Sequence, residues 1–281
     1  MKTTNPEKLL TVAVVVPVYM PFSQLSDNEI LALRQLCSVL YNRDIFLLYP
    51  KTIEVGDYTR FFEPVTVHPV LIDQKYFGSA KRINSLCISP DFYRRFSEYE
   101  YILMHHFDAY VFSDQLDYWC SKGFDYIGAP WFKKDKSSSK RNVVYTNEFL
   151  GAGNGGLSLR KVNAFLEVSQ NKRFMFFHTK FNLAYHLLDS WRVSFLKKAP
   201  GMSLLLKIIE HHTMHEDRFW GLTVPKYYKW FKVASPEQAI KFSFEVMPER
   251  LFILNDNNLP FGCHAWEKYD REFWSLFIKP I

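Results

Sequence analysis

The stretch VAVVVPV at residues 12–18 decides the fold class of this chain. It is β-branched and almost wholly apolar, which is typical of a parallel strand covered on both faces. Pro17 has no N–H to give to a sheet ladder, so the strand should end there. The chain start imitates a short signal peptide, but residues 17–21 contain no small-residue cleavage site. We therefore expect a buried first strand rather than a leader.

The residues after this strand predict a βαβ unit. Ser26 and Glu29 form a capping-box pattern ahead of apolar residues at helical spacing. Apolar strands are then expected at residues 45–49 and 65–70. This succession implies right-handed crossovers in a parallel sheet.

A later strand places an acid where such folds bind ligands. A helix is predicted over residues 83–96, interrupted around Pro90, and the stretch YILMHHFD follows at residues 101–108. Its last residue, Asp108, should lie at the C-terminal edge of the sheet, where open α/β folds bind their ligands. A hard cation that bridges phosphate oxygens needs such a carboxylate. An acid at the end of a strand is more often a cap or turn residue.

Composition narrows the function classes. The hydrophobic content of 48% supplies a sizeable core, and the net charge of +6 suits phosphorylated small molecules, polyanions or anionic membrane surfaces. No zinc-finger spacing, helix-turn-helix pattern or dense Lys/Arg stripe is visible, so nucleic acid is not expected as the main partner. The basic, Ser-rich residues 133–141 are interpreted as a solvated loop.

Cysteine usage and hydropathy indicate a cytoplasmic location. The four cysteines are widely spaced, as in proteins of a reducing compartment. No apolar run reaches the roughly 18 residues of a membrane span, so any membrane contact should be peripheral. Without repeats or a clear linker, we expect a single domain over residues 1–281. A nucleotide-binding half would occupy about residues 10–110 and an acceptor-binding half about residues 111–281.

Two later motifs offer further candidates. Glu216 and Asp217 are paired carboxylates in an aromatic segment, where desolvation would raise a pKa toward that of a general base. Acids at a helix start have the same pattern. His264, in PFGCHAW at residues 260–266, has an imidazole suited to a divalent cation, although a core or surface histidine is the common alternative.

Residues 151–156 hold four glycines in six positions. Such a backbone can approach a ligand closely or adopt positive φ, and a purely structural turn has the same composition. The pattern is neither a dinucleotide fingerprint nor a P-loop.

With these motifs assembled, the chain resembles the GT-A glycosyltransferases. It is more closely similar to a bacterial family labelled glycosyltransferase-like, of unassigned function, found among surface-polysaccharide genes. The resemblance covers most of the chain and rests on five blocks in order: residues 107–112, 125–131, 153–160, 216–217 and 260–266. It implies a GT-A-like, Rossmann-like α/β domain whose central, mostly parallel sheet is flanked by helices.

The motif order is also similar to that of the β-1,4-galactosyltransferases. This similarity implies that Asp108 and His264 are metal ligands and that Asp217 or Glu216 is the catalytic base. His106 stands where the first acid of a DxD motif belongs, which leaves the identity of the metal open, and even the need for one. The residues implied in donor binding are Pro17, Tyr19, Arg82, Asn84, Asp108, Gly155 and Gly156.

The resemblance implies an inverting glycosyltransferase that uses a UDP-sugar with Mn²⁺ or Mg²⁺. The acceptor would be a glycan or a lipid-linked sugar in surface polysaccharide or glycoconjugate synthesis. The segment 183–198 could form an amphipathic helix that touches an anionic membrane, or it could pack in the core. Two alternatives remain: an inactive nucleotide- or carbohydrate-binding protein on the same fold, and a phosphate-transferring or hydrolytic enzyme that acts on sugar phosphates.

Overall fold

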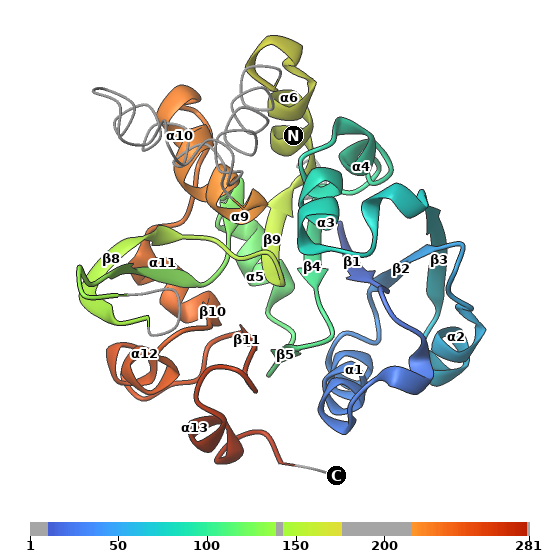
Figure 1. Cartoon of the computed structure of the whole chain (residues 1–281), viewed down its shortest axis with the longest axis horizontal. Coiled ribbons are helices and arrows are strands. Elements are labelled where there is room, and N and C mark those ends of the chain that lie inside the picture. The colour runs from blue at the N-terminus through green and yellow to red at the C-terminus, as the bar shows by residue number, and fades with distance from the viewer. Residues whose placement is uncertain (1–10, 139–142, 176–214, 280–281) are drawn as a thin grey trace, which may run out of the picture.

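The computed structural model describes residues 11–138, 143–175 and 215–279, and a six-stranded sheet forms its centre (Figure 1). The strand order is β3-β2-β1-β4-β9-β6. The pairs among β3, β2, β1 and β4 are parallel, whereas β9 is antiparallel to both β4 and β6. The strands are β1 (Val12–Pro17), β2 (Asp44–Pro50), β3 (Val67–Ile72), β4 (Tyr101–His105), β6 (Tyr126–Ile127) and β9 (Leu157–Lys161).

Alternate residues of β1 serve two cores, one on each face of the sheet. Val14 and Val16 pack in one cluster with residues of α1 (Asp27–Val39), α2 (Gly56–Phe62) and α5 (Leu116–Ser121). Ala13 and Val15 pack in another with residues of α3 (Ala80–Cys87), α4 (Pro90–Arg94) and α6 (Val162–Gln170). The predicted α/β architecture, a mostly parallel central sheet flanked by helices, is confirmed.

Local signals in the sequence set several boundaries as expected. β1 ends at Pro17. The Ser26 hydroxyl accepts a hydrogen bond from the Glu29 N–H, and the Glu29 carboxylate accepts one from the Ser26 N–H, which completes the capping box of α1. The helix predicted over residues 83–96 is split before Pro90 into α3 and α4, with Ser89 capping the second.

The prediction that Asp108 ends a strand was wrong. β4 stops at His105, because the His106 N–H turns to the Gly156 carbonyl at 2.8 Å and the Ala109 N–H donates to the His106 carbonyl at 3.1 Å. Asp108 therefore lies in a tight turn between β4 and β5 (Ala109–Val111). This turn still follows the C-terminal end of a parallel strand.

Strands from the middle and from the C-terminal part of the chain build two smaller sheets beside the main sheet (Figure 1). A three-stranded sheet has the order β10-β11-β5, and a separate hairpin pairs β7 with β8. Phe244, Leu251 and Trp274 belong to a third core under these smaller sheets. The elements are β5 (Ala109–Val111), β7 (Pro130–Lys134), β8 (Tyr145–Ala152), β10 (Ser243–Phe244), β11 (Gly262–His264), α11 (Pro236–Phe242), α12 (Pro248–Leu254) and α13 (Arg271–Ser275).

Short helical turns complete the described chain. α9 (Glu216–Arg218) runs directly into a π-helical turn, η4 (Phe219–Thr223), and then into α10 (Val224–Tyr227). The 3₁₀ turns η1 (Phe22–Gln24) and η2 (Gln74–Tyr76) lie near the ends of β1 and β3. π-Helical turns occur often at functional sites, which directs attention to α9.

The structure corrects the interpretation of the basic tract at residues 133–141. The basic tract is not wholly a loop, because Lys133 and Lys134 belong to β7, while residues 139–142 lie outside the described residues. The segment 183–198 also lies outside them.

All four cysteines are free thiols. Within the described ranges, no helix combines the length and the apolar character needed to cross a membrane.

Candidate active site at the edge of the sheet

Asp108 and His264 are brought together by strand pairing. β5 and β11 are antiparallel, and His264 stands opposite Ala109, the residue after Asp108. The Ala265 N–H donates to the Asp108 carbonyl at 2.9 Å, which fixes the turn against β11. The His264 Nε2 then lies 3.2 Å from the Asp108 Oδ1. Two segments far apart in sequence thus share one site.

Glu245 completes a row of three charged groups with Asp108 and His264, and it is the one of the three that the sequence did not predict. Its Oε1 lies 3.0 Å from the His264 Nδ1. β10 and β11 are parallel, and Phe244 stands opposite Cys263. The next residues along the two segments are Glu245, just after β10, and His264, in β11, and they therefore also lie side by side. No motif marks Glu245, because only the pairing of two short strands gives it a role.

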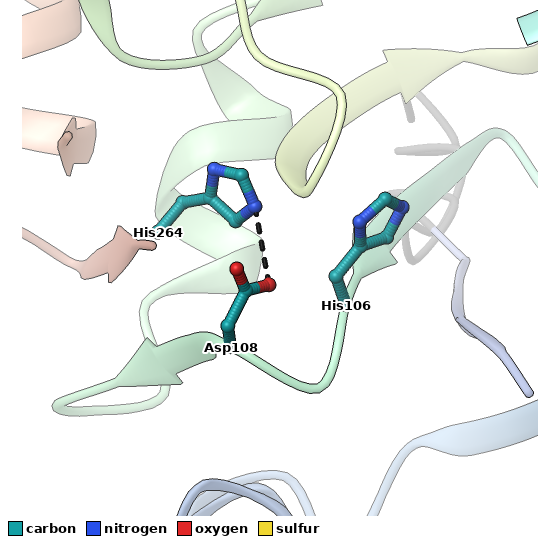
Figure 2. A group of neighbouring side chains, drawn as sticks. All are labelled: His106, Asp108 and His264. Atoms are coloured by element: carbon teal, nitrogen blue, oxygen red, sulfur yellow. Dashed lines mark ion pairs between the residues drawn. The ribbon is translucent and has the colours of Figure 1, made fainter. Parts of the chain in front are cut away.

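His106 adds a second imidazole to the site. Figure 2 shows the Asp108 carboxylate pointing toward the His264 ring, with the His106 ring beside them. Among the described residues, His106, Asp108 and His264 form a group whose potential ligand atoms lie within 4.8 Å of one another. Atoms that each lie ~2.1 Å from a shared cation are separated by about 3.0–3.5 Å at right-angled or tetrahedral geometry. The 3.2 Å between His264 and Asp108 fits this spacing.

The protonation of these groups follows from their contacts. Burial raises the pKa of Asp108, but the hydrogen bond and charge of His264 outweigh burial and hold that pKa well below its usual range. Burial lowers the pKa of His264, yet hydrogen bonds to Asp108 and Glu245 raise it to about 10. Burial lowers the pKa of His106 to about 4, so this ring is neutral near pH 7. Protonated His264 therefore donates from Nε2 to Asp108 and from Nδ1 to Glu245, and a cation bound at Nε2 must replace the proton there.

Glu216 lies next to this site but forms a closed ion pair. Its two oxygens accept hydrogen bonds from Arg160 Nη1 and Nη2 at 3.2 and 2.9 Å. Both side chains are buried, with 4% and 0% exposure. Burial raises the pKa of Glu216 to about 7, against the lowering effect of the Arg160 charge. With both oxygens engaged, Glu216 is better placed to hold Arg160 than to accept a proton from a substrate.

Asp217, the other acid of the pair, lies near enough to Glu245 to feel its charge. Its side chain is partly exposed. Burial raises its pKa, and the negative charge of Glu245 raises it further, whereas the Arg218 backbone N–H lowers it. Within the described ranges, no ion pair joins the Asp217 carboxylate to a cationic side chain. A carboxylate with a raised pKa and no such partner has the properties of a general base.

The glycine segment makes room for these groups. A Cβ on Gly156 would overlap the His264 ring, and one on Gly155 would lie 3.2 Å from the Glu216 Oε1. The Asn154 Oδ1 accepts hydrogen bonds from the N–H groups of Gly156 and Leu157 at 2.6 and 3.0 Å, which fixes the turn. Gly155 and Gly156 thus allow the close approach of site residues.

Of the residues predicted to bind the donor, Tyr19 lies beside the cluster, whereas Asn84 lies next to the residue before α9. The Tyr19 ring packs on Phe107 at 4.7 Å between centroids, and the charge of Asp108 contributes to its raised pKa after burial. The Asn84 Nδ2 lies 3.3 Å from the His215 Nδ1, directly before α9.

The other two predicted donor-binding residues are placed differently. Pro17 ends β1, the strand beside β4. Arg82 donates to the Phe77 carbonyl at 3.1 Å, and no described contact joins it to the cluster.

Comparison with solved structures finds distant similarities to glycosyltransferases. The apo form of GlyE from Streptococcus pneumoniae TIGR4 has 14% identity and a TM-score of 0.42, over 90% of this chain and 54% of that one. Mouse xyloside xylosyltransferase 1 has 10% identity and a TM-score of 0.46, over 91% of this chain and 97% of that one. The bifunctional WbbM has 13% identity and a TM-score of 0.42, over 93% and 47%. This chain thus spans about half the length of GlyE and WbbM. Similarity this distant assigns no activity.

Comparison with curated proteins found no match. A family model described as "Protein of unknown function (DUF5672)" matches residues 66–264, a range that contains His106, Asp108, Asp217, Glu245 and His264. Because this range is most of the 281 residues, the chain belongs to that family.

Proposed function

We propose that this protein is a glycosyltransferase that transfers a sugar from a nucleotide-sugar donor to a hydroxyl acceptor. Two observations support the proposal: the cluster of His106, Asp108 and His264 beyond the C-terminal ends of β1 and β4, and the raised pKa of Asp217, to which the charge of Glu245, the partner of His264, contributes after burial. Open α/β sheets bind nucleotides at this edge. The same group combines a place for a cation with a nearby base, the two features that sugar transfer from a diphosphate requires.

The proposed reaction inverts the anomeric centre. Asp217 accepts the proton of the acceptor hydroxyl while that oxygen attacks the anomeric carbon. The bond between this carbon and the diphosphate breaks, and the nucleoside diphosphate leaves with the bonding electrons. Tyr19 and Asn84 would line the donor, for which we propose a UDP-sugar. Arg160 and Glu216 hold α9, and with it Asp217, against β9.

Asp108, His264 and His106 would hold a divalent cation, which offsets the charge of the leaving diphosphate when bound. Mg²⁺ prefers oxygen ligands and retains much of its water. Imidazole suits the transition metals better. Two histidines with one carboxylate therefore favour Mn²⁺ over Mg²⁺.

Direct binding tests the proposal. UDP should bind tighter with Mn²⁺ than without, and Asp108→Asn should remove that dependence, as measured by calorimetry. A UDP-sugar panel should reveal transfer or slow hydrolysis that Asp217→Asn lowers about 10²- to 10⁴-fold, with UDP binding unchanged. Asp91→Asn, which alters an exposed acid of α4, is the matched control. No donor consumption from a broad panel, together with no effect of Asp217→Asn, would contradict the proposal.

One observation favours a second candidate, a nucleotide- or carbohydrate-binding protein without catalysis. The two nitrogens of His264 lie 3.2 Å from Asp108 and 3.0 Å from Glu245, so a protonated imidazole can donate to both carboxylates where a cation would otherwise bind. This candidate predicts UDP binding that is indifferent to Mn²⁺ and to Asp108→Asn. The same calorimetry therefore separates the two functions.

A further inference from the structure

A pocket of about 560 Å³ opens beside the proposed base. Its size lies within the range of small-molecule sites, roughly 300–1,000 Å³. His215 and Arg218, from the segment that contains Asp217, line the pocket, and so does Glu245, the partner of His264, while Asp217 itself lies behind this wall. The hairpin β7–β8 forms its outer wall, on the far side of the site from β1 and β2 (Figure 1). The pocket is thus placed to receive an acceptor rather than the donor.

The wall of this pocket presents a fixed aromatic ring, Trp131. A Cβ on Gly153 would lie 2.6 Å from its Cη2, and one on Gly221 would lie 3.0 Å from its Cζ3. Glycines from two distant segments therefore let the indole settle against the backbone. Tyr145 and Tyr269 line the same pocket. Electron-rich aromatic faces attract the C–H groups of a sugar ring, so these residues suit a carbohydrate.

The charges on the pocket wall are mostly positive. Lys133 is paired with Glu148 at 2.7 Å, and Glu245 is engaged by His264. Lys134 and Arg218 also line the pocket, and neither has an ion-pair partner within residues 11–138, 143–175 and 215–279. Two cations thus remain available to a ligand in a pocket whose acid is occupied.

We propose that the acceptor is an anionic sugar, one that carries a phosphate or a carboxylate, bound between Trp131 and the cations Arg218 and Lys134. This inference rests on the proposed function. Arg218 and Glu245 line the same pocket, and the charge of Glu245 reaches Asp217, so a sugar whose anionic group is held by the Arg218 guanidinium would lie close to the base. The planar guanidinium pairs with either anion through two parallel hydrogen bonds.

Binding of small sugars without donor tests the acceptor pocket by itself. The probes are glucose, glucuronic acid, glucose 6-phosphate and inorganic phosphate, titrated into the intact protein with intrinsic tryptophan fluorescence or NMR as readout. At least one anionic sugar should bind about tenfold or more tighter than glucose. Arg218→Met and Lys134→Met should each reduce that preference several-fold, while Trp131→Ala should weaken all three sugars. Lys229→Met, which alters an exposed lysine outside the pocket, should change nothing.

Equal affinities for glucose and both anionic sugars would overturn the inference. So would inorganic phosphate binding as tightly as glucose 6-phosphate, because the pocket would then recognise an anion and no sugar. Preference for glucuronic acid or for glucose 6-phosphate distinguishes the carboxylate from the phosphate. Failure of the proposed function appears separately, as absence of Mn²⁺-dependent UDP binding, and leaves these titrations interpretable.

Discussion

Two clusters of charge lie side by side at the edge of the sheet, and they differ in how completely they are satisfied. Arg160 and Glu216 form a pair with both carboxylate oxygens engaged and almost no exposure. In the row of Asp108, His264 and Glu245, the carboxylates have side-chain exposures of 37% and 17%, and one imidazole proton can be replaced. The closed pair holds α9 against β9 and has no free carboxylate oxygen. The open row can exchange a partner, so we assign the chemistry to it.

Breaking the closed pair should have the largest effect on stability. Arg160→Met leaves the Glu216 carboxylate buried without a partner, which costs about 3–5 kcal/mol in comparable pairs. Urea unfolding should show this loss, and adding Glu216→Gln should restore part of it. Lys133→Met, which breaks an exposed pair with Glu148, should cost less than about 1 kcal/mol. Equal losses of stability in the two variants would contradict the distinction between the buried Arg160–Glu216 pair and an exposed ion pair.

A substitution that crowds the row of Asp108, His264 and Glu245 should have the second-largest effect. Gly156→Ala puts a methyl group into the space of the His264 ring, and overpacking of this kind costs about 1–3 kcal/mol. The ring must shift, so Mn²⁺ affinity should fall together with stability. Gly56→Ala is the control, because a Cβ there meets nothing within 4 Å. Unchanged Mn²⁺ binding in Gly156→Ala would remove His264 from the metal site.

Weakening the support of His264 should have a smaller effect that is confined to metal binding. Glu245→Gln removes the negative partner of Nδ1, and loss of such a partner lowers metal affinity about 10- to 100-fold. Titration with Mn²⁺ measures this change, and Glu249→Gln on α12 provides an exposed control. If Glu245→Gln lowers stability without changing metal affinity, Glu245 is structural and does not position His264.

The smallest expected effect is the dependence of the melting temperature on pH. The pKa of His264 is raised from 6.5 to about 10 in the folded protein, so its contribution to stability is fully present below about pH 6.5. That contribution is lost as the pH rises through 10. Without metal, the melting temperature should therefore decline from pH 6.5 to pH 10, and His264→Asn should flatten the decline. His68→Asn, at an exposed histidine of β3, should leave the slope as it is. A slope unaffected by His264→Asn would show that His264 is not held protonated.

The helices and strands in the first half of the fold could be predicted from the sequence because the signals for them are local. A continuous β-branched run predicted β1, the Ser26 capping box predicted the start of α1, and Pro90 predicted a helix break. Each of these follows from the chemistry of neighbouring residues.

Candidate site residues could be named from the sequence, but their roles could not be separated. Glu216 and Asp217 are adjacent and equally acidic, yet one is closed by Arg160 and the other is not. Arg160 lies on β9, and nothing in the sequence links it to α9. Glu245 had no signal at all.

By itself the sequence determined the layered α/β architecture and the residue types available for chemistry, because periodicity, caps and proline act within a few residues. Only the tertiary structure decided which acid is closed and which groups meet. The antiparallel pairing of β5 with β11 and the parallel pairing of β10 with β11 place Asp108, His264 and Glu245 in one row. Register between distant strands sets those contacts, and burial then sets their charge, since both depend on neighbours that the chain brings in from far away.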